Sequence, residues 1–158
     1  HYIFHSTQKF KGMIKNKLLA EKLSNVEVIS DDKIKSQILK KSIFAIVKSG
    51  TVSLDVCKNN IPSMIIYKMN FFNYHLAKFL LKIKYVNMIN IINNKEIIPE
   101  LLQNECNPNE IYKTFHYFMK KPNLIKEQMF VVKKTMDDLK SSTSASDQAS
   151  KVILSYLT

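Results

Sequence analysis

The residues that best predict chemistry form a short turn, Ser49-Gly50-Thr51, between an apolar run and a helical pattern. At the carboxyl end of a strand, such a turn points backbone N–H groups and the positive end of a helix dipole at a phosphate. The hydroxyls of Ser49 and Thr51 could add hydrogen bonds, and Asp55 could accept from the hydroxyls of a ribose. Taken alone, the pattern is explained more simply by local structure, with Thr51 as the helix N-cap and Asp55 complementing the dipole.

The histidines and cysteines, which could bind a metal or act as nucleophiles, show no clustering in the sequence. His5, His75 and His116 have no neighbours at metal-ligand spacing, so we expect surface or half-buried histidines. The two cysteines have neither CxxC nor zinc-finger spacing, which predicts reduced thiols, with Cys57 in the core. No nucleophile elbow or catalytic triad is visible. We therefore expect neither a metal nor an organic cofactor.

A second segment, residues 71–84, combines apolar and basic side chains at helical spacing. Its predicted lipid-facing residues are Phe72, Leu76, Phe79, Lys78 and Lys82. Such a helix could lie on a membrane surface with its lysines at anionic head groups, or pack in a core with a solvated basic side. Both interpretations stay open. No apolar run approaches the roughly 20 residues of a membrane-spanning helix.

The net charge of +11 at first indicates a polyanionic partner. All 24 basic residues are lysine, and lysine, isoleucine and asparagine together supply 57 of the 158 residues. That skew is typical of AT-rich codons, so much of the charge reflects composition. Base-specific DNA reading depends on the arginine fork, which lysine cannot present, and we expect no nucleic-acid partner. Phosphates and anionic lipids remain open as partners.

The order of apolar runs and helical stretches predicts an α/β fold with a Rossmann-like parallel sheet, flanking helices and a helical C-terminal tail. Strands are expected at 2–5, 26–29, 43–47 and 63–66, the third buried on both faces. Helices are expected at 8–22, after Asp31 or Asp32, at 52–59, from Asn107-Pro108, from Asn123 to about Leu139, and near the C-terminus. The opening on Tyr2-Ile3-Phe4, without an initiator Met, indicates a fragment of a longer protein.

An ordered series of segments resembles the C-terminal half of the lipid-A-disaccharide synthases. The matching segments are Ser49-Gly50-Thr51-Val52-Ser53-Leu54-Asp55, Ile61-Pro62, Ile66-Tyr67-Lys68-Met69, Leu76-Ala77-Lys78, Lys84-Tyr85-Val86, Ile89-Asn90-Ile91-Ile92 and Glu96-Ile97-Ile98-Pro99-Glu100-Leu101-Leu102-Gln103. The resemblance is strong from Ile43 to Gln103. A string of this length in the right order is far more specific than any single motif.

The resemblance implies a two-domain GT-B glycosyltransferase whose C-terminal domain binds the UDP-sugar donor. Such an enzyme transfers 2,3-diacylglucosamine from its UDP form to 2,3-diacylglucosamine 1-phosphate, with inversion, in lipopolysaccharide biosynthesis. The residues that it assigns to substrate binding are Ser49, Gly50, Thr51, Asp55, Tyr67, Lys68 and Asn90. The catalytic base is expected in an N-terminal domain, so the chain alone is expected to be inactive.

Some residues depart from the family pattern. Asp55 replaces the usual Glu, Lys68 replaces an Arg and loses its bidentate phosphate contact, and Ile89 replaces a Pro. The phosphate loop expected near the start of this domain is not found in the chain.

The resemblance also predicts domain organisation and partners. Residues 1–104 would form the UDP-sugar domain, truncated at its start, and residues 105–158 helices that pack on it or exchange in a homodimer. The partners would be the UDP-diacylglucosamine donor, the lipid acceptor and the cytoplasmic face of the inner membrane, where the protein would be peripheral. The alternative is a non-catalytic remnant that binds anionic membrane or a partner subunit. An epimerase of the same fold is a weaker third choice.

Overall fold

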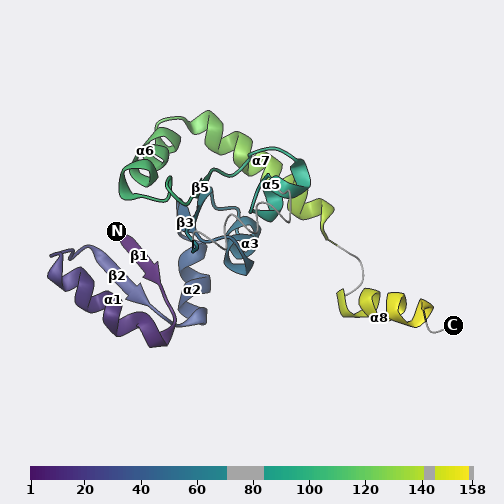
Figure 1. The fold of residues 1–158 in the computed structure, drawn as a ribbon, viewed down its shortest axis with the longest axis horizontal. Coiled ribbons are helices and arrows are strands. Elements are labelled where there is room, and N and C mark those ends of the chain that lie inside the picture. The colour runs from purple at the N-terminus through teal and green to yellow at the C-terminus, as the bar shows by residue number, and fades with distance from the viewer. Residues whose placement is uncertain (71–83, 141–144, 157–158) are drawn as a thin grey trace. The chain divides into compact units, whose positions relative to one another are not determined.

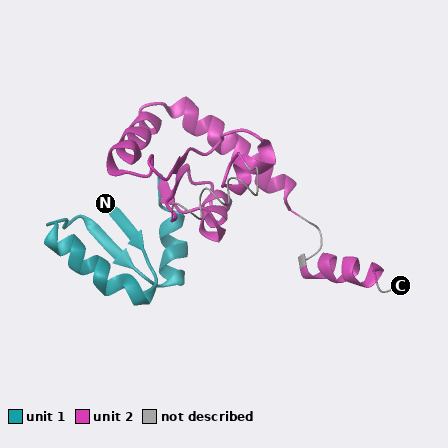
Figure 2. Cartoon of the chain, viewed as in Figure 1, with its two compact units in different colours: residues 1–44 teal, residues 45–158 magenta. Residues whose placement is uncertain are grey.

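The computed structural model describes residues 1–70, 84–140 and 145–156, coloured along the chain in Figure 1. These residues divide into two compact units, His1–Phe44 and Ala45–Thr158 (Figure 2). Each unit contains its own parallel sheet and helices, which confirms the predicted α/β class. The domain boundary near residue 104 stays a prediction.

Unit 1 is a small βαβα element. Its parts are β1 (Tyr2–His5), α1 (Gln8–Ala20), β2 (Val26–Ile29) and α2 (Asp32–Leu39). The two strands pair in parallel from Tyr2↔Val26 to His5↔Ile29, so both strand predictions are confirmed to the residue. The carboxylate of Asp31 accepts from the N–H of Lys33 at 2.7 Å and of Ile34 at 3.1 Å, which makes Asp31 the N-cap of α2.

Unit 2 is built on a three-stranded parallel sheet in the order β3-β4-β5. The strands are β3 (Ala45–Val47), β4 (Ser63–Tyr67) and β5 (Glu100–Leu102). The register places Ala45 opposite Ser63 and Ile65 opposite Glu100. Because β4 is central, its first three residues are buried.

The prediction that residues 43–47 form a strand buried on both faces is wrong in two respects. The strand begins only at Ala45, and Ile43 is 73% exposed. Ile46 is also 45% exposed, so the face of β3 on which its side chain lies is not fully covered.

Five described helices accompany this sheet. They are α3 (Thr51–Lys58), α5 (Met88–Asn93), α6 (Pro108–Met119), α7 (Pro122–Asp138) and α8 (Ala145–Ser155). Asn107 caps α6 by accepting from Glu110 N–H at 3.1 Å, as its sequence predicts. Helix α7 begins one residue before the predicted Asn123 because Pro122 fits the first helical position. It packs against α3, α5 and α6.

The core of unit 2 is a cluster contributed by helices, β4 and the segment before β5. Its buried members are Cys57, Ile65, Ile89, Ile98 and Val132. The prediction of Cys57 as a core residue is confirmed. Among the described helices, none is both long enough and apolar enough to cross a membrane.

A matched pair of isoleucines tests this core. Ile98 is fully buried, so Ile98→Ala should lower the free energy of unfolding by about 2–5 kcal/mol through lost burial and a residual cavity. Ile91 is 47% exposed, and Ile91→Ala should change it by only about 0.5 kcal/mol. Urea unfolding followed by circular dichroism measures both. Equal losses in the two variants would contradict this core.

Candidate functional site

The Ser49-Gly50-Thr51 turn joins the carboxyl end of β3 to helix α3. Gly50 adopts φ +136° and ψ −161°, a conformation that L side chains rarely adopt. Gly50 is also the residue that caps α3, so the interpretation of Thr51 as N-cap is wrong, and Thr51 is the first residue of the helix. The first N–H groups of α3 have no acceptor inside the helix and no side-chain cap from Gly50.

Two hydroxyls around this turn bind the protein itself. Ser49 donates to the carbonyl of Val86 at 2.7 Å. Ser53 is buried on the first turn of α3, and its hydroxyl donates to the Gly50 carbonyl at 2.7 Å. The Ser49 proton is therefore used to hold the turn, which leaves the backbone N–H groups and the hydroxyl of the exposed Thr51 as donors toward an anion.

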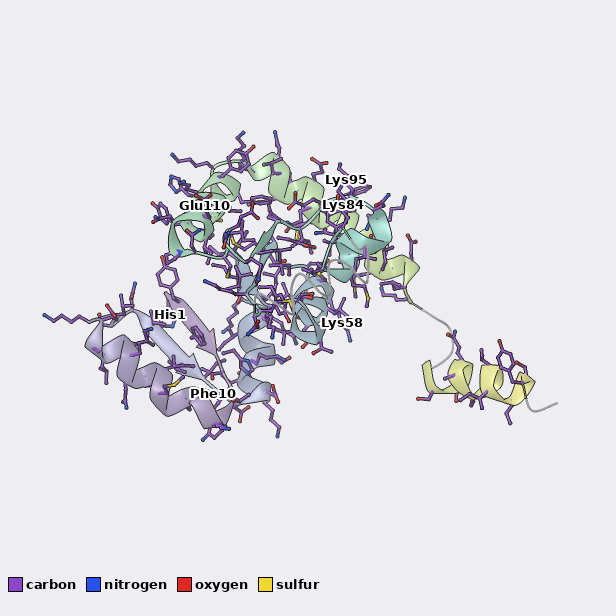
Figure 3. All side chains as sticks on the ribbon, in the orientation of Figure 1. His1, Phe10, Lys58, Lys84, Lys95 and Glu110 are labelled. Atoms are coloured by element: carbon purple, nitrogen blue, oxygen red, sulfur yellow. The ribbon has the colours of Figure 1, made fainter. Side chains whose placement is uncertain are left out.

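Asp55 lies four residues after Thr51 on α3. Residues separated by four positions share one face of a helix, so the Asp55 carboxyl and the first turn of α3 lie along the same side. Asp55 is half-buried. Lys58 ends the helix in an exposed position (Figure 3).

A buried polar network lies beside the turn. The Glu100 carboxylate accepts from the N–H of Val86 and of Asn87, each at 2.9 Å, and from the side-chain amide of Asn90 at 2.8 Å. The side-chain amide of Asn87 in turn donates to the hydroxyl of Ser53 at 3.3 Å. The segment that enters α5 is thus bonded both to β5 and to α3.

Asn90, a predicted substrate-binding residue, is fully buried in this network. Its amide NH₂ donates to the Ile98 carbonyl at 2.7 Å as well as to Glu100. Its oxygen accepts from the N–H of Ile97 at 2.8 Å and of Ile98 at 2.9 Å. Every side-chain donor and acceptor of Asn90 is therefore occupied by the protein itself.

The other strand ends bring further side chains to the same edge of the sheet. The Lys48 ammonium lies 4.8 Å from the ring centroid of Tyr67, and Lys68 follows β4 in an exposed position. Gln103 follows β5 and pairs with Met69, accepting from its N–H at 2.8 Å and donating to its carbonyl at 3.2 Å. The parallel strands therefore gather the turn, Tyr67, two lysines and Gln103 at one edge.

Sequence reasoning missed Lys48, Glu100, Asn87 and Ser53 as parts of this site. A usable signal existed for Lys48, because it directly follows the apolar run of β3 as Lys68 follows that of β4. For Glu100 no local signal existed, since its partners lie 10 to 14 residues away.

Two other groups of residues lie apart from this edge or outside the description. Burial raises the pKa of Cys57 to about 11, so this thiol stays protonated near neutral pH and is a poor nucleophile. Within the described ranges, no three His, Cys, Asp or Glu side chains are grouped to hold a metal.

The predicted lipid-facing residues Phe72, Leu76, Phe79, Lys78 and Lys82 lie outside the described residues.

A cavity of about 420 Å³ lies beside the segment that enters β5, away from the turn. It is lined by Glu96, Ile97, Pro99, Lys113, Thr114, Tyr117 and Phe118. The lining residues come from the segment before β5 and from the second half of α6. The cavity therefore lies near the amino end of β5.

The two glycines of the chain test the turn. A Cβ at Gly50 or at Gly12 would meet nothing within 4 Å, so neither alanine is crowded. Gly50→Ala should still lower the free energy of unfolding by about 1–3 kcal/mol, because alanine resists this φ. Gly12→Ala, inside α1, should raise it by about 0.4–1 kcal/mol. Urea unfolding measures both, and a neutral Gly50→Ala would contradict the described turn.

Comparison with known proteins places the chain in one family. A model of the lipid-A-disaccharide synthetase family matches residues 1–153. The lipid-A-disaccharide synthase of Rickettsia bellii (strain OSU 85-389) is 35% identical over 135 residues, 84% of this chain and 35% of that protein. That of Persephonella marina is 29% identical over 160 residues, 98% of this chain and 42% of that protein. The chain thus spans about a third to two-fifths of these relatives, and it belongs to the lipid-A-disaccharide synthetase family.

Proposed function

We propose that this chain is the donor-binding part of a lipid-A-disaccharide synthase. The enzyme transfers 2,3-diacylglucosamine from its UDP derivative to 2,3-diacylglucosamine 1-phosphate. The observation that carries the proposal is the family match over residues 1–153, which includes the turn at the carboxyl edge of the sheet. Matches to relatives named as synthases do not favour the alternative of a non-catalytic remnant.

The donor's diphosphate would lie at the first turn of α3. The N–H groups of Thr51 and Val52 are the first of the helix, and the helix dipole adds positive potential there. Lys48 and Lys68 leave the neighbouring strand ends and bring two cations to the same edge. Asp55, on the same helix face as Thr51, would accept from the ribose hydroxyls. Tyr67 offers an aromatic wall beside Lys48.

The transfer makes two demands on the protein. A base takes the proton of the acceptor's 6-hydroxyl as that oxygen bonds to C1 of the donor sugar with inversion. The bond between C1 and the UDP oxygen breaks, and UDP leaves with the electron pair. The turn and its lysines would stabilise the charge that grows on UDP. The base would come from the part of the enzyme that corresponds to the remaining length of the relatives.

Membrane and subunit contacts belong to the same proposal. A lipid donor and acceptor favour a peripheral position on the cytoplasmic face of the inner membrane, with residues 71–84 as the contact. Helix α8 exposes Val152, Ile153 and Leu154, each by more than half. An apolar surface of this kind would be covered in a homodimer that exchanges C-terminal helices.

Calorimetric titration separates the parts of the donor site. UDP should bind the chain, and Lys68→Ala should weaken both UDP and inorganic pyrophosphate about tenfold, since it removes a cation at the phosphates. Asp55→Asn should weaken UDP by a similar factor and leave pyrophosphate unchanged, because only UDP has a ribose. Lys58→Ala, at the far end of α3, is the control and should change neither. A chain that binds no UDP would refute the donor site.

Activity is tested in a chimera. The chain replaces the matching segment of the Rickettsia bellii synthase, and the chimera is expressed in a strain whose own synthase can be depleted. We expect growth and lipid A disaccharide to be restored, and Asp55→Asn to reduce disaccharide synthesis in cell extracts. A stable chimera that makes no disaccharide would count against a catalytic role and favour a remnant.

A further inference from the structure

The buried carboxylate of Glu100 has no place in the reaction described above. Glu100 is 8% exposed and lies at the first position of β5, beneath the segment that leads into α5. Its three hydrogen-bond partners are all donors from that segment: the N–H of Val86, the N–H of Asn87 and the amide of Asn90. Burial keeps this carboxylate from touching a nucleotide, so its effect on a ligand is indirect.

We propose that Glu100 is a positioning residue of the donor site, which fixes the phosphate-binding turn through the segment 86–90; this rests on the proposed donor site. Two chains of hydrogen bonds connect the segment to the turn. Val86 accepts from the Ser49 hydroxyl through its carbonyl at 2.7 Å. Asn87 donates to Ser53 at 3.3 Å, and Ser53 donates to the Gly50 carbonyl at 2.7 Å. Both chains begin at residues whose N–H groups Glu100 holds.

The choice of a carboxylate matches the partners. Gln128, another buried side chain beside the sheet, lies on α7, accepts from Ser63 N–H at 2.8 Å and donates to the carbonyls of Ser63 and Ile97 at 3.1 and 3.2 Å. An amide fits that mixture of donors and acceptors. Around Glu100 both oxygens face N–H groups, so an amide there would turn its NH₂ toward a donor whichever way it rotates.

The conformation of Gly50 shows why the turn needs such support. Its backbone conformation is one that few residues adopt, and the turn presents bare N–H groups whose direction determines the fit to a diphosphate. Small displacements of positioned groups cost large factors in binding and rate. A segment held on three N–H groups by one buried carboxylate supplies the required rigidity.

Two pairs of variants test the proposal in the full 158-residue chain by UDP titration. Glu100→Gln keeps the side-chain shape and should raise the Kd of UDP roughly tenfold to a hundredfold. Gln128→Leu removes the buried contacts that join α7 to β4 and should leave the Kd within about twofold, although both variants lower the melting temperature. Each titration is made well below the melting temperature, with folding checked by circular dichroism.

A second pair of variants tests the same proposal in case Glu100→Gln does not fold. Ser53→Ala removes one buried hydroxyl from the chain that reaches Gly50 and should raise the Kd at least about threefold. The control is Thr135→Val on α7, which removes a similarly buried hydroxyl that accepts from Asn93 at 2.9 Å. This variant should not change the Kd. Folded Glu100→Gln and Ser53→Ala chains that bind UDP as the unmodified chain does would overturn the inference and leave the donor site intact. An unmodified chain that binds no UDP would overturn both, and equal losses in the control variants would reduce Glu100 to a general stabilising role.

Discussion

Unit 2 depends on a hydrogen bond between two buried polar side chains, Asn90 and Glu100, at 2.8 Å. A buried carboxylate is tolerated only when donors surround it, so the chain on either side must bring them. Asn90 meets this need from α5 and uses its remaining groups to fix Ile97 and Ile98. The path from α5 into β5 therefore follows from satisfying two side chains rather than from strand or helix propensity.

Two buried polar side chains beside the three-stranded sheet, Gln128 and Glu100, use this principle differently. At the amino end, Gln128 joins α7 to β4 and the segment before β5, beside the apolar cluster. Glu100, at the first position of β5, and Asn87 join the segment before α5 to β5 and to α3. Every buried side-chain nitrogen and oxygen in the described parts of the chain has a partner. Gln128 thus secures the sheet to α7, whereas Glu100 and Asn87 secure the segment that borders the turn.

Local patterns predicted the elements whose causes are local. Strands 2–5 and 26–29 are short apolar runs bounded by helical segments, and the cap at Asn107 is a sequence signature. The strand expected at 43–47 is too long because an apolar run does not show where strand pairing begins. Pairing with β4 begins only at Ala45, opposite Ser63. The turn itself was found, but the cap was assigned to Thr51 since the unusual φ of Gly50 is invisible to pattern. Strand β5 and the role of Glu100 depend on contacts 10 or more residues away, which no local pattern reports.

Because all basic residues of the chain are lysine, the backbone geometry of the Ser49-Gly50-Thr51 turn matters more for the orientation of a phosphate. A guanidinium binds a phosphate through a planar fork that itself dictates orientation, whereas an ammonium is a point charge on a flexible stem. In the proposed donor site, Lys48 and Lys68 would attract a diphosphate to the carboxyl edge but would not orient it. In that site the orientation would come from the N–H groups of α3, which follow Gly50 and the segment bonded to the turn. A site that has lysine where the family pattern has arginine therefore depends more strongly on the precision of its turn, and that precision leads back to the donors held by Glu100.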